Sequence, residues 1–320
     1  MSALPYLLHG TTLALAWFLL LNVAAAGAVA IASPWLTKRA RTVSPGFWLT
    51  LRLFPAALSL GFVSVVFLPS YWHYEPREFV EGFDVTLVAL AVLALAVIGS
   101  GAVRGVSAWR RVARQTERWL RVARPLTLPD TSMPSFAVDT GAPVMALVGV
   151  LRPRLLIARP VLEALTHEEL RAASAHEIGH WRAWDNLKRL AMRSAPDVLF
   201  ASSAARAIER RWVAASEHAA DRSAGNGANA RCALASALVK VARLTPPPTS
   251  AVEPISGLVD GGDIASRVQH LLDDASPAER GAALWRTLAL VLPACALALT
   301  YTPLLRSVHG VTEILVNTLP

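Results

Sequence analysis

Long apolar runs divide this chain and predict four membrane helices. The runs cover about residues 11–32, 53–70, 85–103 and 287–305, and none of them contains a charged side chain. Each run approaches the ~20 residues that an α-helix needs to cross a hydrocarbon core of roughly 30 Å. One or two of them could be buried helices of a soluble core, but uncharged runs of this length favour the membrane.

The polar segment between the third and fourth runs predicts a folded domain that contains both strands and helices. Short apolar stretches at about residues 136–138, 145–148 and 155–157 are separated by turn-forming sequences and indicate β-strands. Thr166-His-Glu-Glu169 has the form of a capping box, which starts a helix. Further helices are predicted at about residues 185–194, 203–224, 228–243 and 263–272.

The composition agrees with a membrane protein that carries one polar domain. Hydrophobic residues make up 54% of the chain and charged residues only 17%, below the roughly 25% of soluble domains. The net charge of +8 is compatible with nucleic-acid binding. The basic residues flank the apolar runs, however, and no platform of aromatic and basic residues accompanies them. Direct binding of nucleic acid is therefore not expected.

The basic residues also predict the orientation of the membrane helices. Lysine and arginine follow the first run at positions 38, 39 and 41, and seven arginines lie between residues 104 and 124. The loop at residues 71–84 contains four acidic residues and one basic residue. Because basic loops stay in the cytoplasm, the segment after the third run is predicted to be cytoplasmic, and both termini external.

This orientation divides the chain into three parts. Residues 1–103 hold three membrane helices, residues 104–286 form the cytoplasmic domain, and residues 287–320 hold the fourth helix and a short external tail. Residues 104–123 mix tryptophans and aliphatic residues with arginines. They form either a juxtamembrane helix that lies along the lipid headgroups or a continuation of the third membrane helix.

The cytoplasmic domain contains the sequence His176-Glu177-Ile178-Gly179-His180, which predicts a metal site. On a helix, His176 and His180 lie one turn apart on the same face, where both imidazoles can bind one zinc ion. Glu177 lies beside them and is the candidate general base that accepts a proton from water at the metal. H-E-x-x-H on a helix is therefore the expected core of a zinc protease.

A zinc protease needs a third protein ligand, and Glu217 is the candidate. Asp221 follows one helical turn later and is expected to accept a hydrogen bond from the second ring N–H of a ligating histidine. The alternative is that both carboxylates only solvate a helix surface. His218 is a rival ligand, but on a helix it points about 100° away from Glu217. Arg267, Arg222 and His270 are candidates for stabilising the transition state, since residues 104–286 contain no tyrosine.

Several elements between about Val144 and Ala224 closely resemble the BlaR/MecR-type membrane metallopeptidases. They are Leu151-Arg-Pro-Arg-Leu-Leu-Ile157, Leu165-Thr-His-Glu-Glu-Leu170, the H-E-x-x-H motif, Asp185-Asn186-Leu187 and Glu217-x-x-x-Asp221. Three predicted membrane helices before the domain and one after it match that family's layout. HtpX-type quality-control proteases share the zinc-binding elements, whereas the Leu-Arg-Pro-Arg and Asp-Asn-Leu elements favour the BlaR/MecR type.

The resemblance implies a mainly α integral membrane protein of the bacterial inner membrane, with a cytoplasmic α+β gluzincin-type domain that binds Zn²⁺. It implies cleavage of a cytoplasmic transcriptional repressor, such as one of the winged-helix type, in response to an external signal. Family sensors carry a penicillin-binding domain after the fourth helix, which this sequence lacks, so antibiotic sensing is not expected. The signal is expected to enter through membrane lipid or a separate sensor protein. The alternatives are an HtpX-type quality-control protease and a non-catalytic zinc-containing receptor or scaffold.

Overall fold

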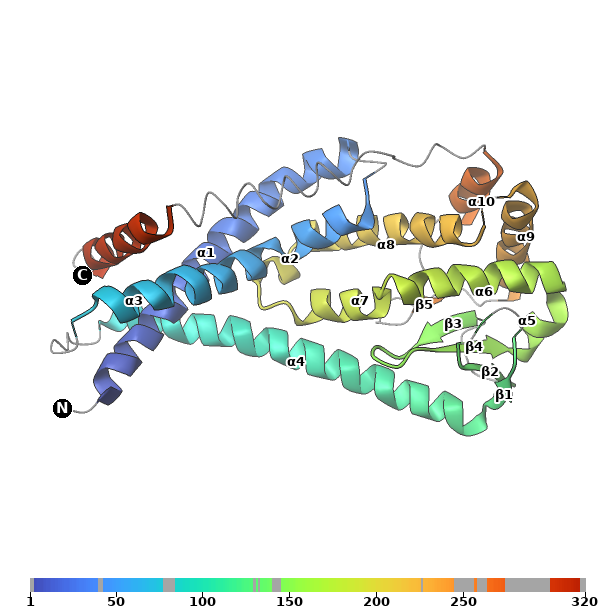
Figure 1. The fold of residues 1–320 in the computed structure, drawn as a ribbon, viewed down its shortest axis with the longest axis horizontal. Coiled ribbons are helices and arrows are strands. Elements are labelled where there is room, and N and C mark those ends of the chain that lie inside the picture. Colours follow the sequence, from blue (N-terminus) through green and yellow to red (C-terminus); the bar gives the residue numbers. More distant parts are fainter. Residues whose placement is uncertain are drawn as a thin grey trace.

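The computed structural model places a bundle of long helices beside a smaller domain of mixed helices and strands (Figure 1). The structure describes residues 3–39, 43–76, 84–128, 131, 133–139, 145–225, 227–244, 256–257, 264–273 and 300–316.

Three long apolar helical segments near the N-terminus are candidate membrane spans. The first is α1 (Ala3–Arg39). The second consists of α2 (Pro45–Phe62), a turn of π-helix (Val63–Phe67) and α3 (Leu68–Tyr74), which follow one another without a break. The third is α4 (Val85–Val122). The prediction of three membrane helices before the polar domain therefore holds by length and hydropathy, although each helix is longer than its apolar run.

The second helix corrects the predicted boundary at residue 53, because it starts eight residues earlier and includes Arg52. The Arg52 side chain is completely buried. Its guanidinium binds Asp197 at 2.8 Å and Glu209 at 2.9 Å. Hydropathy treats an arginine as the end of an apolar run, but these two carboxylates neutralise its charge inside the protein. Pro45 lies in the first turn, where its missing N–H costs nothing.

The third helix decides between the two alternatives for residues 104–123. α4 continues from the apolar run through the arginine-rich segment as one helix, so this segment is an extension of the membrane helix. The predicted fourth membrane helix, at about 287–305, lies mostly outside the described residues. Residues 300–316 are helical, and this C-terminal helix therefore extends beyond Leu305, where the prediction placed an external tail.

The domain contains a five-stranded mixed sheet with the order β1-β2-β4-β3-β5. Its strands are β1 (Arg124–Leu126), β2 (Ser135–Val138), β3 (Met145–Val148), β4 (Arg154–Ala158) and β5 (Ser256–Gly257). β2 and β4 are parallel, and the other pairs are antiparallel. β2, β3 and β4 confirm the three predicted strands, whereas β1 and β5 were not predicted.

One edge of β3 is a place where an extended peptide could pair with the sheet, and β5 covers part of this edge. β5 occupies this edge through the pairs Ala146 with Gly257 and Leu147 with Ser256. A substrate peptide can form backbone hydrogen bonds with β3 at these two positions only if β5 is displaced from them.

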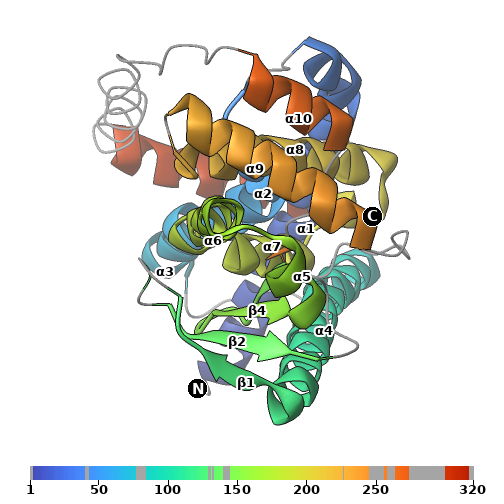
Figure 2. The same cartoon turned by 90° about the vertical axis from the view of Figure 1, so that its right-hand side faces the viewer.

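Both faces of the sheet are covered, as alternation of side chains along the strands requires. Leu147, Leu155 and Ile157 pack against α6 and α9. Ala146 and Leu156 pack on the opposite face against the end of α4 (Figure 2). The helices of the domain are α5 (Arg159–Ala164), α6 (His167–Arg182), α7 (Asp185–Ser194), α8 (Ser203–Ser223), α9 (Ala228–Leu244) and α10 (Ile264–Leu272), with a 3₁₀ turn at Val198–Ala201.

α7 to α10 agree closely with the predicted ranges, α5 was not predicted, and α6 shows the predicted start signal. The Thr166 hydroxyl accepts a hydrogen bond from the Glu169 backbone N–H, and the Glu169 carboxylate accepts one from the Thr166 backbone N–H. This capping box satisfies two N–H groups that the first turn of α6 leaves without helical partners.

A second apolar core joins the domain to the membrane helices. Trp48 of α2 packs with Met192 of α7 and with Ile208 and Trp212 of α8. A hydrogen bond also links the two parts: the Asn22 side-chain amide of α1 donates to the backbone carbonyl of Pro196, which lies between α7 and α8. α7 and α8 are therefore anchored to the membrane bundle and also, as shown below, to the metal site.

Candidate metal centre

Helices α6 and α8 cross closely, and this crossing builds the centre. Gly179 of α6 lies at the contact, where an added Cβ would come within 3.2 Å of the Ala220 Cα atom and overlap the Ser223 hydroxyl. A glycine at this position of the H-E-x-x-H motif therefore lets the backbone of α8 approach. The approach brings the carboxylate of Glu217, on α8, to the face of α6 that carries both histidines.

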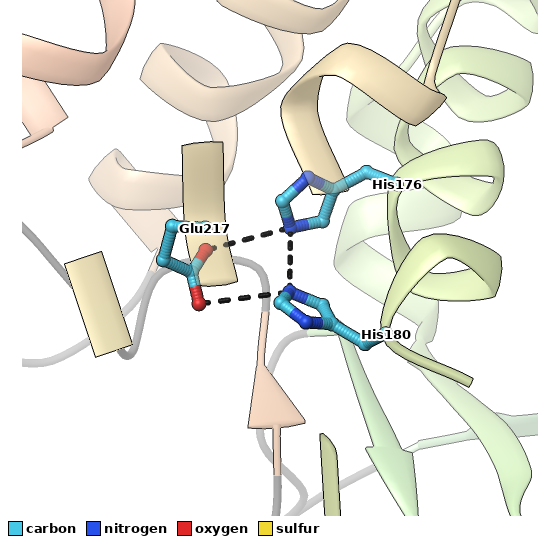
Figure 3. Close-up of side chains that lie close together, drawn as sticks. All are labelled: His176, His180 and Glu217. Carbon is cyan, nitrogen blue, oxygen red and sulfur yellow. Dashed lines mark hydrogen bonds and ion pairs between the residues drawn. The ribbon is translucent and has the colours of Figure 1, made fainter. Parts of the chain in front are cut away.

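His176, His180 and Glu217 form a buried cluster with their ligand atoms within 4.8 Å of one another (Figure 3). The two Nε2 atoms are 3.2 Å apart. The Glu217 oxygens lie 3.5 Å from the Nε2 atom of His176 and 3.6 Å from that of His180. These separations are close to the ~3.3 Å expected between two atoms bound to one zinc ion at about 2.0–2.1 Å in tetrahedral geometry. We call this group the His–His–Glu cluster.

The outer nitrogen of each imidazole has its own carboxylate. His176 Nδ1 lies 2.9 Å from Asp221 Oδ1, and His180 Nδ1 lies 2.7 Å from Asp185 Oδ2. Because an ionised carboxylate only accepts hydrogen bonds, it holds the ring proton on Nδ1 and leaves the Nε2 lone pair facing the cluster. Both histidines are thereby oriented as metal ligands.

Glu177 lies in the same buried space but has no hydrogen bond within the part of the chain that the structure describes. Both of its carboxylate oxygens are buried and unpaired. Burial raises the pKa of Glu177 to about 7. A buried carboxylate costs free energy unless it has a partner, so this one is suited to receive a proton or a water molecule.

Arg267 of α10 closes the cluster on another side. Its guanidinium forms two bonds to Asp221, at 3.1 and 2.5 Å, and lies 3.0 Å from Glu217 Oε2. The side chain is 2% exposed. The predicted role of Arg267 at the transition state stays a prediction, since the contacts in the structure position two carboxylates.

The other candidates lie farther out. His218 points away from the cluster toward His270, with ring centroids 4.7 Å apart. Arg222 and His270 are exposed. Of the two rival third ligands, the structure therefore brings Glu217 to the histidines and leaves His218 outside.

Asp185 is a site residue whose role the sequence reasoning did not assign. It is 2% exposed, and it accepts a hydrogen bond from Ser216 of α8 in addition to its bond with His180. The next residue, Asn186, donates to the carbonyls of Leu147 and Gly149 at 3.0 and 2.8 Å. The two neighbours thus tie the start of α7 to the histidine and to the end of β3. The Asp-Asn-Leu element was the only signal in the sequence, and it indicated a family rather than a role.

The charges around the imidazoles suit a divalent cation. Burial alone would lower the pKa of both histidines, but Asp221 and Glu217 raise it for His176, and Glu217 and Asp185 raise it for His180. Burial alone would raise the pKa of Glu217, but the two histidines and Arg267 hold it well below its usual range. Positive charge is therefore stabilised at this position. Two imidazole nitrogens and a carboxylate are also the ligand types of catalytic zinc sites.

Comparison with known families agrees with this chemistry. Residues 110–213 match the family model described as Peptidase family M48. This match indicates a metallopeptidase. It includes the end of α4, the sheet strands β1 to β4 and the whole H-E-x-x-H motif, and it ends four residues before Glu217. A search of curated proteins finds no match. Together with three apolar helices near the N-terminus, this similarity supports a membrane metalloprotease.

Proposed function

We propose that this chain is a membrane-embedded zinc endopeptidase. The observation that carries the proposal is Glu177, buried with two unpaired oxygens beside a His–His–Glu cluster. A purely structural zinc site is usually closed by four protein ligands and has no use for such a carboxylate. This residue therefore supports an enzyme over a non-catalytic zinc-containing receptor or scaffold.

The residues of the site can carry out peptide hydrolysis in a simple order. His176, His180 and Glu217 would hold the zinc ion, and Asp221 and Asp185 would keep the histidine lone pairs directed at it. A bound zinc ion supplies Lewis acidity toward the peptide carbonyl and lowers the pKa of water. Glu177 accepts the proton of the attacking water and then delivers it to the leaving amine. Because burial raises the pKa of Glu177 to about 7, this carboxylate can both accept and release the proton near neutral pH.

For the substrate, we propose a cytoplasmic transcriptional repressor of the winged-helix type, as in the BlaR/MecR-type peptidases that the sequence resembles. The Leu-Arg-Pro-Arg and Asp-Asn-Leu elements support this choice. A separate sensor protein or the membrane lipid would supply the signal. The second candidate is an HtpX-type quality-control protease, and the match to the M48 model supports a membrane metalloprotease without favouring the BlaR/MecR type.

We place the protease domain in the cytoplasm of a bacterium and the chain in its inner membrane, with both termini outside. Arginines along the second half of α4 support this orientation. Labelling single cysteines in intact cells tests it, after Cys232 and Cys295 are replaced by serine. An impermeant thiol reagent should modify a cysteine at position 78 and spare one at position 247. The reverse pattern would contradict both the orientation and a cytoplasmic substrate.

The substitution Glu177→Gln tests the mechanism. It keeps the three ligands and the shape of the side chain but removes the base, so general-base catalysis worth about 10²–10⁴-fold should be lost. The purified variant should retain as much zinc as the wild type and cleave an unstructured protein at least about 100-fold more slowly. Glu168→Gln is the matched control, because Glu168 is exposed on the same helix. Full cleavage by the Glu177 variant would exclude the mechanism.

A second comparison separates the two physiological roles. The wild type in lipid vesicles is given a candidate repressor and a generic unfolded protein, each with and without the candidate sensor protein. A regulated signalling protease should cleave the repressor selectively and only when activated. Equal and unconditional cleavage of both proteins would favour quality control.

A further inference from the structure

A second group of metal-ligand side chains lies where the C-terminal helix meets the end of α3. Glu75 directly follows α3, and His309 and Glu313 project from the C-terminal helix, residues 300–316. One ligand atom from each of the three side chains lies within 4.8 Å of the other two. We propose that Glu75, His309 and Glu313 form a second site for a divalent transition metal.

The two elements that carry these ligands are held together independently of any metal. The Ser70 hydroxyl, in α3, donates to the Leu305 carbonyl at 2.7 Å. The Trp17 indole, in α1, donates to the Thr312 hydroxyl at 3.1 Å. Both bonds fix the C-terminal helix against the membrane bundle near the three ligands. The ligand positions are therefore set by rigid elements, as a metal site requires.

Helical spacing places two of the ligands correctly. His309 and Glu313 are four residues apart, so they lie one turn apart on the same face of the C-terminal helix. Glu75 approaches from the other element, with its Oε2 atom 3.6 Å from the Nδ1 atom of His309. Two ligands on one zinc ion are separated by roughly 3.3–3.5 Å when the bonds are about 2.0–2.1 Å. The distance between Glu75 and His309 is therefore already close to this value, and all three ligand atoms lie within 4.8 Å of one another.

The balance of charge favours a cation with two charges. A protonated His309 would neutralise one of the two carboxylates, whereas a divalent metal neutralises both and leaves the imidazole neutral as a ligand. The side chains of His309 and Glu75 are 27% and 17% exposed, and the ring of Tyr74 stacks on that of His309. Partial burial strengthens the attraction to a cation, and the remaining exposure leaves a path of entry.

The ligand types restrict the metal. An imidazole nitrogen favours zinc and other first-row transition metals over calcium and magnesium, which take oxygen ligands. Three protein ligands leave at least one position for water or for a ligand from another molecule. The two carboxylates are more exposed than that of Glu217, so the second site should bind zinc more weakly.

The two metal sites lie toward opposite ends of the molecule. The C-terminal helix lies beside α3 at the left of Figure 1, while α6 and the sheet lie at the right. With the protease domain in the cytoplasm, the second site faces outward, where it would bind metal from outside the cell. An ion there would fasten the C-terminal helix to α3.

Counting metal ions in the purified full-length chain tests the proposal. The protein is stripped of metal, equilibrated with a buffered excess of zinc, and analysed by elemental mass spectrometry. We expect two zinc ions per chain in the wild type, and one in His309→Asn and in Glu313→Gln. Glu117→Gln is the matched control, because Glu117 is exposed on α4 and its substitution removes one negative charge, as Glu313→Gln does. Unchanged protease activity of the variants would show that they are folded.

The Glu217→Gln background separates this site from the catalytic one. In that background the remaining zinc should disappear when His309→Asn is added, and zinc should raise the melting temperature only while His309 is present. One zinc per chain in the wild type would overturn the proposal. So would two ions that survive both the His309 and the Glu313 substitutions, because the second ion would then lie elsewhere.

Discussion

The substitution Asp185→Asn isolates the contribution of a carboxylate that lies outside the His–His–Glu cluster. Asp185 accepts the Nδ1–H of His180 at 2.7 Å and is 2% exposed. Asparagine has the same shape and can still accept this hydrogen bond through its amide oxygen. It lacks the negative charge that makes the imidazole a stronger base and helps to bind a cation. The change therefore removes electrostatic support while it preserves the packing of α7.

The expected loss follows from the strength of such contacts. Substituting the partner of a ligating histidine typically costs 10- to 100-fold in metal affinity. This loss corresponds to about 1.4–2.7 kcal/mol. Asp185→Asn should fall near the lower end, since a neutral acceptor remains. Asp185→Ala should fall near the upper end, because it leaves His180 and Ser216 without their acceptor in a buried site.

Competition with a fluorescent zinc chelator measures this affinity in detergent. Lys188→Gln is the control, because Lys188 lies 3.4 Å from Asp185 but is 31% exposed, so its removal should change zinc affinity less than about threefold. Circular dichroism and the melting temperature of the metal-free protein show whether each variant is folded. Wild-type zinc affinity in a folded Asp185→Ala protein would refute the assignment. Equal losses for the Lys188 and Asp185 variants would show a general effect of charge.

Two further predictions concern the packing that supports the site. Burial alone would raise the pKa of Glu169, but hydrogen bonds from Lys240, Ser236 and the Thr166 backbone lower it to about 2. This carboxylate therefore stabilises the fold above its unfolded pKa of about 4.5, and the contribution is lost as the pH falls toward 2. The melting temperature of Glu169→Gln should be lower than that of the wild type at pH 7, and the difference should become smaller below pH 4.5. A difference in melting temperature that does not change with pH would contradict this. Gly101→Ala should destabilise by about 1–3 kcal/mol, because its Cβ would come within 2.8 Å of the backbone oxygen of Ser194, the last residue of α7. Gly99→Ala meets nothing within 4 Å and should be neutral or stabilising. Equal melting temperatures for these two alanine variants would contradict the close contact between α4 and α7.

Local features of this protein were predictable from the sequence because they depend on neighbouring residues. The capping box at Thr166 uses atoms three residues apart, and the spacing of His176 and His180 uses one turn of the same helix. Apolar runs of about 20 residues likewise indicate membrane helices without knowledge of their neighbours. The choice of Glu217 over His218 followed from the same helical geometry, once a third ligand was required.

Contacts between distant segments were decided by the tertiary structure. The roles of Asp185 and Arg267 arise only when α7 and α10 pack against α6 and α8, and nothing in their local sequence indicates these partners. Arg52 was placed outside the apolar run that begins at residue 53. It is buried nevertheless, because Asp197 and Glu209, about 150 residues away in the sequence, neutralise its charge. The strand that pairs with the edge of β3 is β5, whose residues lie more than 100 positions later in the chain. The free energy of such contacts depends on burial and on the approach of charges, which are properties of the folded chain rather than of spacing along it.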